Sequence, residues 1–210
     1  MKKRSVPTLV KDEKLIEKRR NQIIKSAVAL FKKKGFHRTT TREIAETAGF
    51  SIGTLYEYIR QKEDILYLVC DAIYEQFRTR MDAAISQGGN SGERLHHAIR
   101  AYFKLIDDMQ DEMLVMYQES KSLNKESLQY VLKKELLLAE IFENLIADCV
   151  ADGISELTPS EMTAFAHNIL VVGQMWAFRR WALQKLYTLE EYTELQMKLL
   201  NVYETFPIEV

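Results

Sequence analysis

Polar side chains of a kind that can read DNA bases lie on one short segment, residues 51–59. Within it Ile52, Leu55 and Ile59 are spaced by three and four residues, so they share one side of a helix. The opposite side carries groups that could hydrogen-bond to base edges in the major groove, namely Thr54, Glu57 and Tyr58. Gly53 lies on this side too, where a glycine costs about 1 kcal/mol relative to alanine. Close approach of the backbone to a duplex would explain it, with close packing against a neighbouring helix as the alternative.

Further helices are needed to position this segment, and the preceding sequence predicts two. Residues 18–34 carry apolar side chains at helical spacing and are followed by Gly35, a common residue just after a helix end. Thr40 and Glu43 form a capping-box pattern that begins a short second helix. Ser51 can cap the third helix after a glycine turn. Two short helices joined by a tight turn and packed on a longer one form a helix-turn-helix.

Charge is strongly segregated along the chain, although the net charge of its 210 residues is only −1. Residues 1–62 contain sixteen Lys or Arg against six Asp or Glu, a net charge of +10, whereas the remainder carries −11. This segregation indicates a polyanion-binding module joined to a part that does not bind polyanions. We predict a mobile basic arm over residues 1–17, a helix-turn-helix domain over residues 18–64, and a larger helical domain over residues 65–210.

The composition favours an all-α globular protein. Hydrophobic residues make up 47% of the chain and charged residues 28%, and three prolines with eight glycines leave few helix breakers. No apolar stretch approaches the roughly 20 residues needed to span a membrane, and the charged start does not read as a signal peptide. We therefore expect a cytoplasmic protein that does not contact membranes. Cys70 and Cys149 lack metal-ligand spacing and are expected to be buried free thiols.

The segment from residue 35 to residue 64 resembles the N-terminal signature of the TetR family of bacterial regulators. The matching residues are GFHRTTTREIA at 35–45, Ala48 and Gly49, GTLY at 53–56, and KED at 62–64. The resemblance covers residues 18–66, and the rest of the chain is similar only in helical character and length. It implies a homodimeric transcriptional regulator that binds double-stranded operator DNA through a conserved fold and a ligand through a variable C-terminal domain.

The resemblance also implies which residues grip the phosphates. Members of the family commonly use a residue at the start of the second helix, here Thr41, a tyrosine at the position of Tyr58, and a lysine at the position of Lys62. A hydroxyl near free amides suits an anion, and Lys62 opens the next helix, where the helix dipole favours anions.

Other basic and polar residues of this half have expected roles of their own. Ser51 is counted with the DNA-binding residues, and Tyr56 is expected to pack inward. Glu57 either accepts a hydrogen bond from a cytosine amino group or pairs on the surface with Arg60 or Lys62. The basic residues of the arm and first helix could add contacts to DNA that carry little sequence information, and they are Lys2, Lys3, Arg4, Arg19 and Arg20.

A helix from about residue 62 to residue 86 links the two domains, and further helices are predicted at 93–109, 111–121, 125–152, 159–186 and 189–204. The last two have wide apolar faces. In the resembling family, two such helices from each subunit form a four-helix dimer interface, and a palindromic operator requires a two-fold protein. We assign to this interface Phe165, Ile169, Val172, Leu195 and Leu199, with ordinary core packing as the alternative.

Methionine and aromatic side chains concentrate in the second domain and suggest a pocket for a small apolar effector, because methionines repack around varied ligands. The selected ligand-binding residues are Phe103, Met113, Met116, Tyr117, Phe142, Trp176 and Arg179. Residues 169–181 are also similar to the corresponding helix of fatty-acyl-CoA-responsive members, where Arg179 or Arg180 would meet an acidic group. A surface arginine is the alternative. The expected function is a repressor released from a palindromic operator by such an effector, and nothing in the sequence separates repressor from activator.

Other classes of function are less well supported by the sequence. We find no phosphate-binding glycine loop and no hydrolase or protease motif, so no enzyme activity, catalytic residue or cofactor is expected. His96 and His97 with the acidic residues near 107–112 could suggest a metal site, but adjacent histidines diverge on a helix and a solvated charged face is expected instead. A dimeric helical adaptor without specific DNA binding is the remaining alternative.

Overall fold

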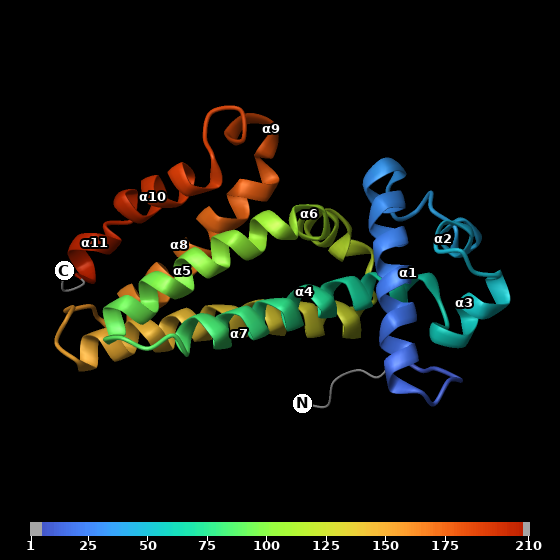
Figure 1. Cartoon of the computed structure of the whole chain (residues 1–210), viewed down its shortest axis with the longest axis horizontal. Helices are drawn as coiled ribbons and strands as arrows, with labels where there is room; N and C mark the ends of the chain where they lie inside the picture. Colours follow the sequence, from blue (N-terminus) through green and yellow to red (C-terminus); the bar gives the residue numbers. More distant parts are fainter. Residues whose placement is uncertain (1–5, 208–210) are drawn as a thin grey trace. The chain divides into compact units, whose positions relative to one another are not determined.

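The computed structural model describes residues 6–207, and every regular element among them is a helix (Figure 1). The elements are α1 (Glu13–Lys34), α2 (Thr41–Thr47), α3 (Ile52–Tyr58), α4 (Lys62–Ile85), α5 (Ser91–Asp108), α6 (Gln110–Glu119), the 3₁₀ turn η1 (Ser120–Ser122), α7 (Lys125–Ala151), α8 (Pro159–Phe178), α9 (Arg180–Leu183), α10 (Leu189–Leu199) and α11 (Val202–Thr205). The predicted all-α fold class is confirmed. No helix in this part of the chain is long and apolar enough to cross a membrane.

The chain divides into two compact units, and the division differs from a boundary at residue 64. The first unit includes the chain up to Ile73 and also Asp111–Val131, and the second includes Tyr74–Gln110 and the chain from Leu132 onward. Helices α4 and α7 therefore each contribute to both units. Side-chain contacts explain why the first unit extends beyond the helix-turn-helix: Lys32 of α1 pairs with Asp111 of α6, and the rings of Tyr67 and Tyr130 lie 5.0 Å apart.

The first unit is built on the helix-turn-helix predicted from the sequence. Helix α1 buries Ile23, Ala27 and Phe31 on its inner face, and α2 and α3 contribute Ile44 and Leu55, all at most 3% exposed. Each helix in this group contacts the other two. Short helices of seven residues are marginal alone, so this shared core is what keeps α2 and α3 folded.

Helix α1 begins five residues earlier than predicted, and the segment before it is held in place. The side chain of Asp12 caps the helix by accepting a hydrogen bond from the backbone N–H of Leu15. Val6 is only 3% exposed, and the N–H of Leu9 donates to the carbonyl of Glu57. Residues 6–12 are thus held by the buried Val6 side chain and by hydrogen bonds, where a mobile arm was expected. Lys2, Lys3 and Arg4 lie outside the described residues.

The second unit has a core of aromatic rings contributed by several helices. Tyr102 of α5 stacks edge-on with Phe77 of α4 and Phe142 of α7, at centroid distances of 5.5 and 5.6 Å. Its hydroxyl donates to the carbonyl of Leu170 in α8, 2.9 Å away. The neighbouring Phe103 contacts Tyr192 of α10, which in turn contacts Trp176 of α8. Both cysteines are buried and free, as expected.

Two helices predicted near the C-terminus are each divided in the structure. The predicted helix 159–186 ends at Phe178, where Arg179 leaves the helical conformation with φ −111° and ψ 23°, and only the short α9 follows. The predicted helix 189–204 is interrupted at Asn201, which adopts the left-handed conformation with φ 58°. Asparagine tolerates that conformation better than most residues. Neither break has a glycine or proline from which the sequence could have predicted it.

Candidate nucleic-acid interface

Helices α2 and α3 of the first unit begin with the capping hydrogen bonds that the sequence predicted. The hydroxyl of Thr40 accepts from the N–H of Glu43, whose carboxylate accepts in return from the N–H of Thr40, which completes a capping box. The side chain of Ser51 accepts from the N–H of Thr54 at 3.0 Å. These bonds satisfy amides that a short helix leaves free at its start, and they fix the directions of α2 and α3.

Hydroxyl groups gather on the exposed side of α2 and α3. The hydroxyls of Thr41 and Tyr56 lie 3.1 Å apart and join the start of α2 to the middle of α3. The hydroxyls of Ser51 and Thr54 lie 3.0 Å apart at the start of α3. Hydroxyl groups can donate to a phosphate oxygen or a base acceptor, so the predicted contacts from Thr41, Ser51 and Thr54 to DNA stay predictions that this arrangement allows.

Gly53 lies between these hydroxyls with open space above its backbone. A Cβ atom added at position 53 would meet only the Ser51 hydroxyl, at 3.6 Å, which is an ordinary contact. The packing explanation for this glycine, a tight approach to α2, therefore has no support in the structure. Close approach of DNA stays a prediction for this position.

We expect Gly53→Ala to separate folding from DNA binding. Alanine should raise the free energy of unfolding by up to about 1 kcal/mol, because it favours the helix and meets no obstacle. Operator affinity should fall about tenfold, because the methyl group occupies the surface that faces the duplex. Urea unfolding and fluorescence anisotropy with operator DNA measure the two effects. Unchanged affinity in the stabilised variant would show that the duplex does not approach this position.

The two tyrosines of α3 are placed opposite to the prediction. Tyr58, selected as a phosphate contact, is only 3% exposed, whereas Tyr56, expected to pack inward, is 44% exposed. The cause is the register of the helix: Leu55 and Tyr58 are three residues apart and share the buried side, which places Tyr56 among the outward residues. We therefore predict Tyr56, in place of Tyr58, as the phosphate contact.

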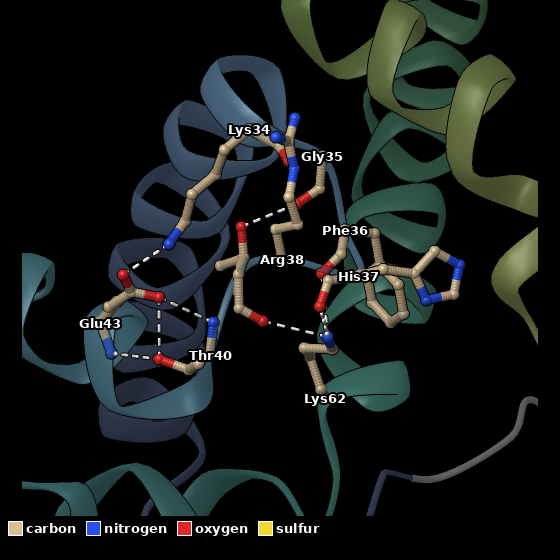
Figure 2. A network of polar contacts seen from close by, with 9 residues as sticks. Lys34, Gly35, Phe36, His37, Arg38, Thr40, Glu43 and Lys62 are labelled. Carbon is tan, nitrogen blue, oxygen red and sulfur yellow. Dashed lines mark hydrogen bonds and ion pairs between the residues drawn. The ribbon is translucent and has the colours of Figure 1, made fainter.

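Lys62 makes intramolecular contacts in the structure, as Figure 2 shows. Its Nζ donates to the carbonyls of Phe36 and Thr39, at 2.8 and 3.0 Å, and lies 4.3 Å from the centre of the Phe36 ring. The ammonium group thus binds the turn between α1 and α2. The phosphate contact predicted for Lys62 would compete with these carbonyls for the same three N–H donors.

The same turn is fixed from α1 and α2 as well. Lys34 pairs with the Glu43 carboxylate, and the hydroxyl of Thr39 donates to the carbonyl of Gly35 (Figure 2). The hydrogen bond from Lys34, followed by those from Thr40, lowers the pKa of Glu43 to about 2. The carboxylate therefore stays charged throughout the physiological pH range and keeps the capping box closed.

Two charged residues have surroundings that bear on their predicted roles. Among residues 6–207 no ion pair joins the Glu57 carboxylate to Arg60 or Lys62, and Glu57 is exposed. The predicted surface ion pair is therefore not formed, and the contact to a cytosine amino group stays a prediction. Arg20 was expected to contact DNA but donates within the protein, to the carbonyls of Val6 and Tyr58. Burial lowers the pKa of Arg20, an effect opposed by the nearby carboxylates of Asp64 and Asp71.

Helix α6 and the following turn also bind the α1–α2 turn, a connection that no sequence pattern indicated. The carboxylate of Glu119 accepts from the N–H of Phe36 at 3.0 Å. The hydroxyl of Ser122 lies 3.1 Å from Nε2 of His37. The turn that positions α2 is thus held by Lys62 of α4 on its carbonyls and by Glu119 of α6 on an amide.

The residues selected for ligand binding fall into both units. Met113, Met116 and Tyr117 belong to the first unit, where the two methionines are buried and Tyr117 is exposed. The second unit contains the rest of the set, Phe103, Phe142, Trp176 and Arg179. The first three of these belong to its buried aromatic core, and the Trp176 indole donates to the Asp107 carboxylate at 2.8 Å. Arg179 is exposed, with its guanidinium 5.6 Å from the ring of Trp181.

The residues selected for the dimer interface also differ in placement. Leu195 and Leu199 are exposed on α10, at 40% and 75%. Val172 is half-buried, and Phe165 contacts Phe206 of the same chain. Ile169 has no exposed surface on a single chain, so it has none to lose on association. The exposed side of α8 instead presents Ala164, His167, Asn168 and Val171.

The alternative of a metal site near His96 finds no cluster to form it. Within the described part of the chain, no three His, Cys, Asp or Glu side chains are grouped so that they could hold a metal ion. Nε2 of His96 lies 2.9 Å from the Phe206 carbonyl, and burial lowers the pKa of this histidine. His96 thus anchors the C-terminal segment in the second unit.

Two family descriptions match the chain along most of its length. Residues 23–67 match the bacterial regulatory proteins of the tetR family, and residues 88–176 match the tetracyclin repressor-like C-terminal domain. The HTH-type transcriptional regulator HbdR of Aromatoleum sp. (strain CIB) is 32% identical over 93% of this chain and 85% of its own. The fatty acid metabolism regulator protein of Bacillus subtilis (strain 168) is 30% identical over 63% of this chain and 66% of its own.

A solved structure with the same fold carries both kinds of ligand expected of such a protein. AibR in complex with isovaleryl coenzyme A and operator DNA superposes with a TM-score of 0.73, covering 91% of this chain and 100% of that one at 19% identity. At that identity the likeness establishes the fold alone, while the family rests on the sequence matches over both halves. The chain therefore belongs to the TetR family of bacterial transcriptional regulators.

Proposed function

We propose that this regulator is a cytoplasmic repressor that binds a palindromic operator as a homodimer and is released by an acyl-coenzyme A. The observation that carries the DNA-binding part is the hydroxyl-lined, glycine-containing exposed side of α2 and α3. Membership of a family of transcriptional regulators supports the same role and leaves no need for a catalytic function.

The dimer is proposed to form through the exposed sides of α8 and α10. Leu195, Leu199 and Val171 are exposed apolar side chains on these helices, and burial of such side chains drives association. Ala164 and Asn168 extend the same side of α8 toward its start. A two-fold dimer presents two copies of α3, as a palindromic operator requires. Leu199→Glu should therefore yield monomers in analytical ultracentrifugation, whereas Ile169→Val should remain dimeric.

An acyl-coenzyme A is proposed as the effector for two reasons. The B. subtilis relative is named as a fatty acid metabolism regulator, and AibR, with the same fold, binds isovaleryl coenzyme A. The aromatic core of the second unit could accommodate an apolar acyl chain, while exposed Arg179 offers a cation for an acidic group. Calorimetric titration with coenzyme A esters of increasing acyl length tests this directly, with free coenzyme A as the control.

Signal transmission would use the contacts around the α1–α2 turn. Helices α4 and α7 each contribute to both units, and Lys62 of α4 and Glu119 of α6 both hold that turn. An effector that moves α4 or α6 would change the position of α2 and α3 relative to α1. A true effector must lower operator affinity, and an acyl-coenzyme A that binds tightly without doing so would be ruled out.

The exposed and buried tyrosines provide a test of the DNA-binding surface. We expect Tyr56→Phe to weaken operator binding about tenfold, because it removes a hydroxyl that can donate to a phosphate. Tyr58→Phe should change affinity less than threefold, since Tyr58 is almost fully buried. Both variants should be measured by anisotropy on a duplex selected by the wild-type protein from a random library. The reverse order of effects would restore Tyr58 as the phosphate contact.

A further inference from the structure

The recognition helix α3 ends with backbone carbonyls that its own residues do not satisfy. A helix leaves its last carbonyls without partners, and α3 is only seven residues long. The carbonyl of Leu55 accepts from the N–H of Ile59. The carbonyls of Glu57 and Tyr58 receive hydrogen bonds from the chain before α1 and from α1 itself.

Residues 6–9, which we call the N-terminal strap, supply two of these hydrogen bonds. The N–H of Leu9 donates to the Glu57 carbonyl at 3.0 Å, and the hydroxyl of Thr8 donates to the same carbonyl at 2.8 Å. The Thr8 hydroxyl in turn accepts from the N–H of Val10 at 3.2 Å. The strap thus lies against the C-terminal end of the helix expected to enter the major groove.

Arg20 of α1 fastens the strap and the recognition helix together. Its Nη2 donates to the Val6 carbonyl at 2.6 Å and to the Tyr58 carbonyl at 3.2 Å. The Val6 side chain is buried. Because the guanidinium is partly buried between Val6 and Tyr58, its hydrogen bonds are less weakened by water than those of an exposed arginine.

We propose that the N-terminal strap and Arg20 are positioning elements for operator recognition, which cap the C-terminal end of α3 and fix its direction. This inference rests on the DNA-binding function of the regulator. The strap lies before residue 23, where the match to the family's DNA-binding description begins. Contacts to base edges from α3 carry the sequence information, whereas phosphate contacts carry none directly. The strap therefore acts on selectivity between DNA sequences.

Two truncations separate the strap from the basic residues before it. Removing residues 2–5 deletes Lys2, Lys3 and Arg4, and should weaken binding to the selected duplex and to a random duplex by similar factors. Removing residues 2–9 also deletes the strap, and should reduce the preference for the selected duplex a further tenfold or more. Each full-length or truncated protein is measured at the same salt concentration on both duplexes.

A single-atom change tests the same idea without removing any backbone. Thr8→Val keeps the shape of the side chain and removes its hydroxyl, together with the hydrogen bonds to the Glu57 carbonyl and from the N–H of Val10. It should weaken binding to the selected duplex at least fivefold, the factor for loss of one hydrogen bond. Thr8→Ser keeps the hydroxyl and should bind within twofold of the wild-type protein. Thermal unfolding of all variants shows whether the whole first unit has been destabilised instead.

Hydrogen exchange in the absence of DNA makes the test independent of the operator. The amides of residues 55–59 should exchange at least fivefold faster in Thr8→Val and in the longer truncation, while those of α5 stay unchanged. If both truncations show the same selectivity and the same exchange in α3, the strap has no positioning role. Failure of the wild-type protein to select any duplex would instead overturn DNA recognition itself, and the exchange data would still decide whether the strap caps α3.

Discussion

Lys62→Met is expected to lower the free energy of unfolding by about 2 kcal/mol, because hydrogen bonds from a charged donor contribute about 1.5–3 kcal/mol each and this lysine is partly exposed. The carbonyls of Phe36 and Thr39 would lose their ammonium partner, and the Phe36 ring would lose a cation 4.3 Å from its centre. Operator affinity should fall more than tenfold, because the α1–α2 turn, which positions α2 and α3, would lose its hydrogen bonds to Lys62.

The salt dependence of binding distinguishes this structural role from a phosphate contact. If Lys62 only holds the turn, the slope of log affinity against log salt concentration should be unchanged in Lys62→Met. If it contacts a phosphate, the slope should fall by about one and the stability of the DNA-free protein should change little. Lys25→Met is the matched control, because Lys25 is exposed on α1 and should leave stability within about 0.5 kcal/mol.

Gly173→Ala is expected to destabilise the second unit by about 2–3 kcal/mol, although alanine is the better helix former. A Cβ atom at position 173 of α8 would lie 2.4 Å from Cε1 of Tyr102 and 3.2 Å from Cε1 of Phe103. Tyr102 cannot move away easily, because its ring packs against Phe77 and Phe142 and its hydroxyl is bonded to Leu170. Helices α5 and α8 would therefore have to separate.

Urea unfolding of Gly173→Ala beside Gly53→Ala compares the same substitution in two helices with opposite surroundings. The first should lose stability and the second should gain it. Combining Gly173→Ala with Tyr102→Leu, which removes the ring that blocks the methyl group, should give less destabilisation than the sum of the two single changes. Equal stability of the two glycine variants would show that α5 and α8 are not packed as closely as the structure has them.

Local sequence patterns predicted the helix-turn-helix because its signals act within a few residues. The box of Thr40 with Glu43 and the cap by Ser51 depend only on neighbouring amides, and both formed as expected. Of the three apolar residues predicted on one side of α3, Leu55 and Ile59 are buried, whereas Ile52 is 37% exposed. The same spacing could have exposed the error over Tyr58, which lies three residues after Leu55 and so shares that side.

Most predictions that were wrong or missing concern hydrogen bonds between residues far apart in the sequence. Lys62 meets carbonyls more than twenty residues earlier, and Glu119 meets the N–H of Phe36 across eighty-three positions. The sequence alone does not distinguish a lysine that contacts a phosphate from one that donates to the carbonyls of a distant turn. The strap was read as a mobile arm for the same reason, since Thr8 and Leu9 bond to Glu57 forty-nine and forty-eight residues later.

The sequence by itself determined the all-helical class, the DNA-reading module and the family, because helix periodicity, caps and a compact signature are properties of adjacent residues. Tertiary structure alone decided which tyrosine of α3 is exposed and where the long C-terminal helices break. It also decided which lysine and arginine side chains form hydrogen bonds within the protein. Side-chain burial and hydrogen bonding between distant segments depend on how the helices pack against one another. Patterns among neighbouring residues do not determine that packing.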